Sequence, residues 1–175
     1  MKIKNGFTLI ELLVVIAIIG ILSSVALASL NSARTKANVA RKQEDFKNIS
    51  TALYMFYDQY GRMPVNYNPC CGATEGSPTA SGIYPYEKSM QELVDAKFLP
   101  TIPKSPDAQK YSYYDYGQGS KDSTTGIEIG VILATFLPSL PKSTTGISPS
   151  CRPWAPGVNW CSQNVNDYYC ICVVY

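Results

Sequence analysis

Histidine is absent from this sequence, and charged residues make up only 16% of it. Histidine is the commonest general base and metal ligand in proteins, so its absence weighs against many classes of enzyme and metalloprotein. The charged share is well below the about 25% of a typical globular domain. The shortage is concentrated near the start, because residues 12–22 contain no polar side chain and Glu11 is the only ionisable residue in the range 7–30.

A strong net charge is also missing. The chain carries 15 basic and 13 acidic residues, a net charge of +2, and Lys2 and Lys4 supply that excess. Without residues 1–6, 13 basic residues balance 13 acidic ones. A chain that is neutral beyond residue 6 has no overall attraction for nucleic acid.

The six cysteines all lie beyond the apolar segment, at positions 70, 71, 151, 161, 170 and 172. If this part of the chain is exported, the even number predicts up to three disulfides, with 15 ways of pairing them. Thiolate metal sites and free thiols are the alternatives, although neither the adjacent pair Cys70 and Cys71 nor Cys170-x-Cys172 has the C-x2-C spacing of zinc ribbons. We also expect Cys170 and Cys172 to share one face of a strand and to reach different partners, with Cys151 and Cys161 as candidates.

Residues 1–6 are short and basic, and an apolar run, 7–30, follows at once. As a helix this run is about 36 Å long, enough to span a bilayer core of about 30 Å. Three interpretations compete: a secretory signal cleaved after Ala28, a plain membrane anchor, and a leader cleaved before the apolar run so that the run stays in the product.

Glu11 separates these interpretations. An acidic side chain near the end of a membrane segment costs about 1–3 kcal/mol and requires a partner. Cleavage after Gly6 would give Phe7 a free cationic amine four residues before Glu11. The carboxylate and the ammonium could then neutralise each other, within one chain or between neighbours. The alternative is a glutamate tolerated at the membrane interface.

The stretch GFTLIELLVVIAIIGIL, residues 6–22, resembles the signature of type IV pilins and type II secretion pseudopilins. The resemblance implies cleavage between Gly6 and Phe7 by a prepilin peptidase, methylation of the new Phe7 amine, and pairing of Glu11 with a neighbouring subunit's amine. Family members often carry a proline near the end of this segment, where this chain has Ala28. Without it we expect no kink there. Small residues that let helices approach closely recur at helical spacing, although they are also common in membrane helices: Ala17, Gly20, Ser24 and Ala28.

No helix breaker follows until Gly61 and Pro64, so one helix is predicted up to Tyr60. The face expected to pack on the rest of the domain consists of Phe46, Ile49, Leu53, Phe56, Tyr57 and Tyr60. Between residues 31 and 47 the basic side chains are Arg34, Lys36, Arg41, Lys42 and Lys47. They conflict with the positive-inside rule for a helix whose N-terminus is cytoplasmic. A solvated face, salt bridges between subunits and a DNA-binding stripe are the alternatives.

Beyond the helix, residues 62–86 are predicted as a loop. A short helix is expected over 89–96, with Met90, Leu93 and Val94 inward and Pro100 ending it. Strands are expected over 110–116, 126–137 and 168–175. Four tyrosines could stack on a ligand or pack across strands: Tyr111, Tyr113, Tyr114 and Tyr116. A weak resemblance to the major pseudopilin of type II secretion implies a calcium site, for which Asp115 and Asp122 are candidates without a recognisable motif.

The sequence therefore predicts an α+β fold in which a long N-terminal helical spine packs on a small antiparallel sheet. The expected parts are a leader, 1–6; a membrane and filament-core helix, 7–30; an amphipathic half, 31–61; and a globular head, 62–175. No catalytic arrangement and no cofactor are expected.

The resemblance implies a filament subunit that is first a single-pass inner-membrane protein with a cytoplasmic N-terminus. After assembly it would belong to a periplasmic or extracellular filament. Its partners would be copies of itself, the prepilin peptidase, the inner-membrane assembly platform and membrane lipids. The alternative is a minor pilin or competence component that binds DNA, a surface or a secreted substrate. Release of an exported enzyme at Ser29 is disfavoured.

Overall fold

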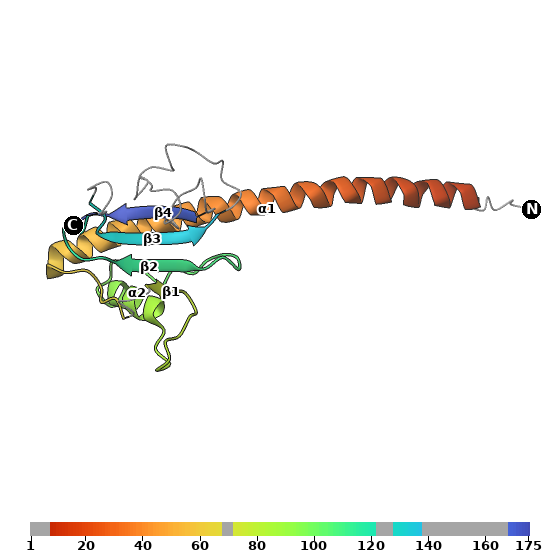
Figure 1. Cartoon of the computed structure of the whole chain (residues 1–175). Coiled ribbons are helices and arrows are strands. Elements are labelled where there is room, and N and C mark those ends of the chain that lie inside the picture. Colours follow the sequence, from red (N-terminus) through yellow and green to blue (C-terminus); the bar gives the residue numbers. More distant parts are fainter. Residues whose placement is uncertain (1–7, 68–71, 122–127, 138–167) are drawn as a thin grey trace, which may run out of the picture. The chain divides into compact units, whose positions relative to one another are not determined.

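The computed structural model describes residues 8–67, 72–121, 128–137 and 168–175. The chain divides into two compact units, Met1–Asn38 and Val39–Tyr175. Helix α1, Leu9–Tyr60, contributes to both (Figure 1). The second unit also contains helix α2 and a four-stranded sheet, which carries the chemistry of the head.

Helix α1 matches the prediction closely, with its start at Leu9 and its end at Tyr60. Its sequence contains no proline, and Gly61 ends it with φ +65°, a conformation that glycine adopts without the steric cost of a side chain. The helix is unbroken at Ala28, as the absence of proline there predicts. Of its predicted packing face, Phe46, Ile49, Leu53 and Phe56 are buried. Tyr60 is the correction, because it is half exposed at the last position of the helix, although its ring still contacts that of Phe56.

Helix α2, Pro85–Asp95, begins four residues before the predicted start. Pro85 occupies its first turn, where the missing N–H is no loss, so a residue counted as part of a loop in fact opens a helix. The end also differs from the prediction. Lys97 adopts φ +64°, and its N–H donates a hydrogen bond to the Val94 carbonyl. The Phe98 N–H donates to the Leu93 carbonyl, and the two bonds together form a Schellman motif. The helix thus ends before Pro100 is reached.

The sheet is antiparallel throughout, in the order β1-β2-β3-β4. Its strands are β1, Ala73–Thr74; β2, Tyr111–Asp115; β3, Val131–Phe136; and β4, Tyr168–Val173. Strands β2 and β4 fall where they were predicted, whereas β3 starts later because Gly130 at φ +61° interrupts the extended run. Strand β1 lies within the segment predicted as loop.

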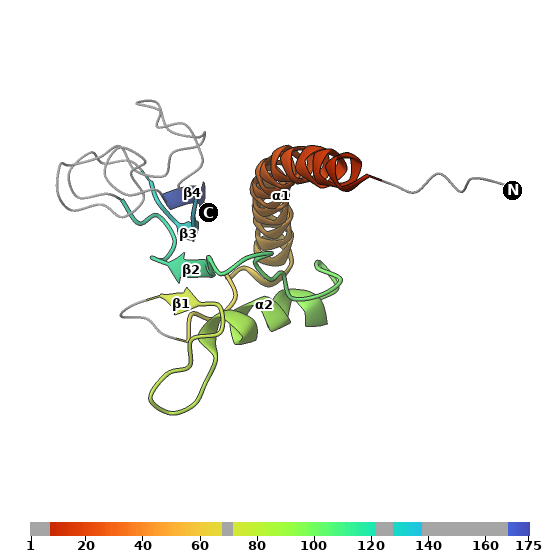
Figure 2. The same cartoon turned by 90° about the vertical axis from the view of Figure 1, so that its right-hand side faces the viewer.

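The main core lies between one face of this sheet, helix α2 and residues 39–60 of α1, which run behind the sheet in Figure 1. Phe46 of α1 meets the Tyr111 ring edge-on at 5.1 Å and stacks on Tyr169 at 5.7 Å. Such aromatic pairs contribute about 0.5–1.5 kcal/mol each beyond the burial of their area. Figure 2 shows α2 beside β1, on the same side of the sheet as α1. The predicted α+β architecture is confirmed.

The opposite sheet face carries a second buried cluster. Ile132 and Ala134 are fully buried there, and Cys170 lies next to Ala134 in the register. Gly72 is opposite Tyr114 when the β1–β2 register is extended by one residue. A Cβ at Gly72 would lie 1.9 Å from the Tyr114 ring, so the backbone passes directly over that ring. Only glycine permits this approach.

Candidate functional site

The N-terminal end of α1 is closed by a reciprocal pair of side chains. Thr8 precedes the first helical residue, and its Oγ1 accepts a hydrogen bond from the Glu11 N–H at 3.3 Å. In return, Glu11 Oε2 accepts from the Thr8 N–H at 2.8 Å and from Thr8 Oγ1 at 2.7 Å. This is a capping box, which satisfies N–H groups that a helix end otherwise leaves without partners.

The capping box gives Glu11 a structural partner that the sequence analysis did not identify, although the Thr-x-x-Glu spacing was visible in it. The predicted pairing of Glu11 with a free Phe7 amine stays a prediction, since Gly6 and Phe7 lie outside the described residues. Among the described residues, the hydrogen bonds to the Glu11 carboxylate end on Oε2. Within the described part of the chain, Oε1 therefore has no hydrogen-bond donor.

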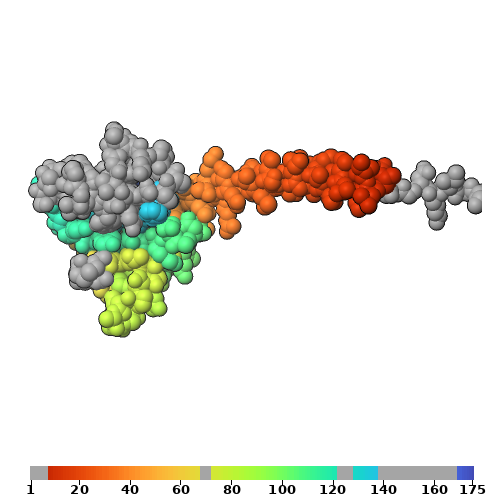
Figure 3. Space-filling model, turned by 45° about the vertical axis from the view of Figure 1, so that its right-hand side comes forward, coloured from red at the N-terminus to blue at the C-terminus, as the bar shows by residue number. Residues whose placement is uncertain are grey.

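From Leu9 to Leu30, the large apolar side chains of α1 point into open space (Figure 3, red). Each is between 46% and 78% exposed. By length and composition this part of α1 could cross a membrane, and none of its most apolar window is buried. An apolar surface of this extent in water would aggregate, so it marks a membrane or assembly interface.

The small residues on this helix leave room for a neighbour. A Cβ at Gly20 would meet nothing within 4 Å. Ser24 Oγ donates to the Ile21 carbonyl at 2.7 Å, so its polar group is satisfied inside the helix and does not demand water. The expected stripe of small residues is therefore compatible with close helix packing in lipid.

The basic residues after the apolar run do not form one stripe. Lys42 is fully buried, and its Nζ lies 2.7 Å from Asp107 Oδ1. This contact is an ion pair. Arg41 lies 3.9 Å from Asp45 on the same helix. Lys42 is therefore not part of a solvated face or of a DNA-binding stripe, whereas Arg34 and Lys36 are exposed in the first unit.

An open groove of about 640 Å³ lies between α1 and the segment that follows α2. Ala52, Met55 and Phe98 are among its apolar lining, and Arg41 and Lys104 are among its charged lining. Asp45 also lines it, and it accepts a hydrogen bond from the Tyr111 hydroxyl at 2.7 Å. The groove was not foreseen, because it joins segments about 50 residues apart in the sequence.

The tyrosine cluster divides between the two sheet faces. Tyr111 and Tyr113 are fully buried in the core. Burial raises the pKa of Tyr111, and the hydrogen bond to the Asp45 carboxylate raises it further. Burial likewise holds the pKa of Tyr113 well above its usual value, and its hydroxyl donates to the Pro64 carbonyl at 2.9 Å. Tyr114 and Tyr116 lie apart from this core, so the four do not form one ligand platform.

Asp115 is already engaged within the head. Its Oδ1 accepts from the Gly117 N–H at 2.8 Å and from the Tyr175 hydroxyl. Burial and this bond raise the pKa of Tyr175 above its usual value, so that it remains a neutral donor. Asp122 lies outside the described residues, and calcium binding stays a prediction. Among the described residues, no group of three or more potential metal ligands occurs.

Cys170 and Cys172 occupy the same sheet face, as predicted. The structure records both as disulfide-bonded. Residues i and i+2 of a strand are about 6.6 Å apart, whereas bonded cysteines need Cβ atoms about 3.5–4.5 Å apart. Each therefore bonds a different cysteine. The candidate partners Cys70, Cys71, Cys151 and Cys161 all lie outside the described residues.

The comparisons with known proteins agree with this arrangement. Residues 1–27 match the model of the prokaryotic N-terminal methylation motif. The chain is 30% identical over 118 residues to the type II secretion system core protein G of Aeromonas hydrophila, covering 67% of this chain and 78% of that protein. It is 32% identical over 121 residues to the type IV major fimbrial protein FimA of Dichelobacter nodosus, covering 68% of this chain and 70% of that protein.

The type IV major pilin protein PilE1 of Neisseria gonorrhoeae is 33% identical over 91 residues, covering 52% of this chain and 50% of that protein. No solved structure matches the chain at comparable significance. Two of these relatives are matched over more than two thirds of their length, and the methylation motif falls on the end of the chain that carries Thr8 and Glu11. The chain belongs to the family of type IV pilins and type II secretion pseudopilins.

Proposed function

We propose that this chain is a structural, non-catalytic subunit of a type IV pilus-like or type II secretion pseudopilus filament. Processing would separate Gly6 from Phe7, methylate the new amine, and leave the apolar helix on the subunit. The methylation motif and the relatives named as pilins and as a secretion core protein support this function. The carrying observation is the exposed apolar stretch of α1 that begins at a capped glutamate.

The proposed mechanism uses this stretch twice. Before assembly it is the membrane anchor, with its N-terminus cytoplasmic, and lipid covers its side chains. During assembly the same side chains pack against neighbouring helices. The apolar surface of the helix therefore stays shielded from water while the subunit leaves the bilayer. The assembly platform would drive this transfer.

Glu11 would set the axial register of that packing. A carboxylate in an apolar surrounding is stable only when a cation neutralises it. The capping box turns Glu11 Oε2 toward Thr8 and leaves Oε1 for the amine of a neighbouring Phe7. One carboxylate and one amine per subunit then select a single offset between adjacent helices.

The test is a comparison of Glu11→Ala and Glu11→Gln with the wild-type chain. Cleavage after Gly6 should proceed in both variants, because the cleaved bond does not include Glu11. Filament yield, measured by shearing filaments from cells and quantifying the subunit, should fall at least tenfold. The matched control, Asp58→Asn, removes an exposed acid from the head unit and should assemble normally. Wild-type yield from Glu11→Ala would overturn the register role.

A further inference from the structure

Two cations follow directly after the apolar stretch of α1. Leu30 is its last large apolar residue, and Arg34 and Lys36 lie four and six residues further on. At 1.5 Å per residue their Cα atoms are about 6 and 9 Å beyond Leu30 along the helix axis. A bilayer about 40–45 Å thick encloses a core of about 30 Å, so the headgroup region on each side is about 5–7.5 Å deep. The Arg34 Cα lies within this depth, and the Lys36 Cα lies just beyond it, from where the flexible lysine side chain can reach back to the headgroups.

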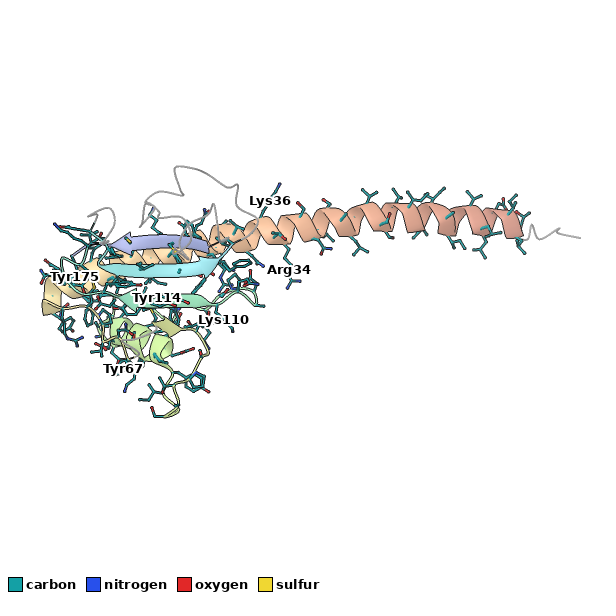
Figure 4. All side chains as sticks on the ribbon, in the orientation of Figure 1. Arg34, Lys36, Tyr67, Lys110, Tyr114 and Tyr175 are labelled. Carbon is teal, nitrogen blue, oxygen red and sulfur yellow. The ribbon has the colours of Figure 1, made fainter. Side chains whose placement is uncertain are left out.

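The two cations leave the helix on opposite sides. Successive residues of an α-helix are rotated by about 100°, so residues 34 and 36 are about 200° apart. Figure 4 shows the two labelled side chains extending to opposite sides of the ribbon. A single neighbouring protein surface cannot meet both, whereas a headgroup layer surrounds the helix and meets them together.

No acid of the same unit stands at this level. In the described part of the first unit, 8–38, the only acidic residue is Glu11, at the far end of the apolar stretch. The residues directly beside the two cations are small: Ala33, Thr35 and Ala37. Thr35 Oγ1 donates to the Asn31 carbonyl at 3.0 Å, so this hydroxyl is satisfied within the helix. The charge of this level is therefore positive, and its uncharged side chains are small.

We propose that Arg34 and Lys36 form a collar that binds the headgroups of anionic phospholipids and fixes the depth of the helix before assembly. The proposal rests on the membrane-held stage of the proposed function. About 20 residues separate Glu11 from the end of the apolar stretch at Leu30, which corresponds to about 30 Å. With the collar in the headgroups of one leaflet, Glu11 therefore lies at the opposite boundary of the hydrocarbon core. There it meets water and the capping residue instead of lipid tails.

The collar also explains why these cations lie on the non-cytoplasmic side of the membrane, where the positive-inside rule predicts few Lys and Arg residues. Attraction to anionic headgroups is strong within a Debye length and is lost when salt shortens that length. The collar would hold subunits at one depth in the membrane and release lipid when they enter a filament. Lipid selectivity is therefore its direct signature.

The test measures lipid selectivity by electron spin resonance on the full chain in phosphatidylcholine bilayers with trace spin-labelled lipid. The motionally restricted fraction reports the lipids that contact the helix. Spin-labelled phosphatidylglycerol should associate about threefold more strongly than spin-labelled phosphatidylcholine at low salt. The ratio should fall toward one in 1 M salt, where the Debye length is about 3 Å.

The double variant Arg34→Gln/Lys36→Gln should lose most of this preference. The matched control Lys47→Gln/Lys104→Gln removes two exposed cations of the second unit, of which Lys47 lies about 16 Å further along α1 than Lys36. The control should retain the wild-type ratio. Lys2 and Lys4 are present in every arm, so the comparison isolates the collar.

The outcomes distinguish failure of the collar from failure of the proposed function. A wild-type ratio near one, or a double variant with the wild-type ratio, overturns the collar and leaves the membrane-held subunit intact. A double variant that keeps the lipid ratio but loses filament yield assigns the two cations to a neighbouring subunit instead. A chain without any motionally restricted lipid is not in the bilayer, which contradicts the proposed function itself.

Discussion

Glu11 and Lys42 are both charges placed where charge is costly, and the chain handles them differently. Glu11 lies at the start of an apolar helix, and its carboxylate accepts hydrogen bonds from the backbone N–H and the hydroxyl of Thr8. Lys42 is enclosed by the head and meets Asp107. The first charge remains accessible and so can take part in assembly. The second is sealed and contributes only to the fold.

The Lys42 pair predicts an asymmetry between two variants. Asp107→Asn leaves a buried ammonium, 0% exposed, without its counter-ion, and should lower the free energy of unfolding of the head by about 2–3 kcal/mol. Lys42→Met leaves a carboxylate that is 31% exposed and can be hydrated, and should cost at most about 1 kcal/mol. Urea unfolding of the full chain in detergent, followed by tyrosine fluorescence, measures both.

Arg41→Gln is the matched control, because its partner Asp45 lies 3.9 Å away at the surface. It should change stability by less than about 0.5 kcal/mol. Equal losses for Asp107→Asn and Arg41→Gln would mean that Lys42 is hydrated in solution and that the buried pair does not form.

The same pair gives the head an acid-sensitive contribution to stability. Burial raises the pKa of Asp107, but the Lys42 ammonium and the bonds from the Gln109 N–H and Ser105 outweigh it, so the net shift of the pKa is downward. The contribution is therefore complete above the unfolded value of about 3.9 and is lost as pH falls through the lower folded pKa. Asp107→Asn should flatten the stability profile across that acidic window, and an unchanged profile would exclude this assignment.

At the scale of elements, two glycines determine how closely the sheet packs. Gly72 lets the chain cross the Tyr114 ring, and Gly130 lets β3 begin against the end of β4. A Cβ at Gly130 would lie 2.2 Å from the Val173 carbonyl oxygen. Because that neighbour is backbone, no side-chain rotation can relieve the collision.

Gly130→Ala should therefore destabilise the head by more than about 3 kcal/mol, combining this collision with the cost of a positive φ. Gly61→Ala is the control, because Gly61 has φ +65° and open space around its Cβ position. It should lose only about 1 kcal/mol. Thermal unfolding followed by near-ultraviolet circular dichroism compares the two, and equal losses would refute the close approach of β4.

The elements that the sequence predicted well are those with a strong periodic or compositional signal. Helix α1 has an uninterrupted pattern and a glycine stop, and β2 and β4 are rich in aromatic and β-branched residues. Helix α2 was placed too late because Pro85 favours both a loop and a first helical turn. Its end at Asp95 depends on the left-handed conformation of Lys97, which no local residue type predicts.

The candidate site was predictable only where its residues give a local signal in the sequence. Glu11 stands out because it is the single charge in an apolar run, and the Thr8-x-x-Glu11 spacing is a local signal. The partners of Lys42 and Asp45 are distant in sequence, at residues 107 and 111, so only the folded chain brings them together. None of the alternatives that the sequence offered for Lys42 buried it inside the head, whereas the fold encloses it against Asp107.

At the scale of the whole molecule, the chain combines an N-terminal unit with almost no internal core and a head that has a core of its own. The first unit gains stability only when lipid or other helices cover its apolar surface. The head is stabilised by two buried clusters, one on each sheet face. A subunit of this kind can pass from membrane to filament without refolding its head.

In the proposed function, the apolar helix stays on the subunit and enters the filament with a new N-terminus. Intact-mass measurement and N-terminal sequencing of the subunit from purified filaments test this claim most directly. We expect a chain that starts at Phe7, carries a methylated amine and retains residues 7–30. A filament subunit that starts at Met1, or an exported chain that starts at Ser29, would contradict it.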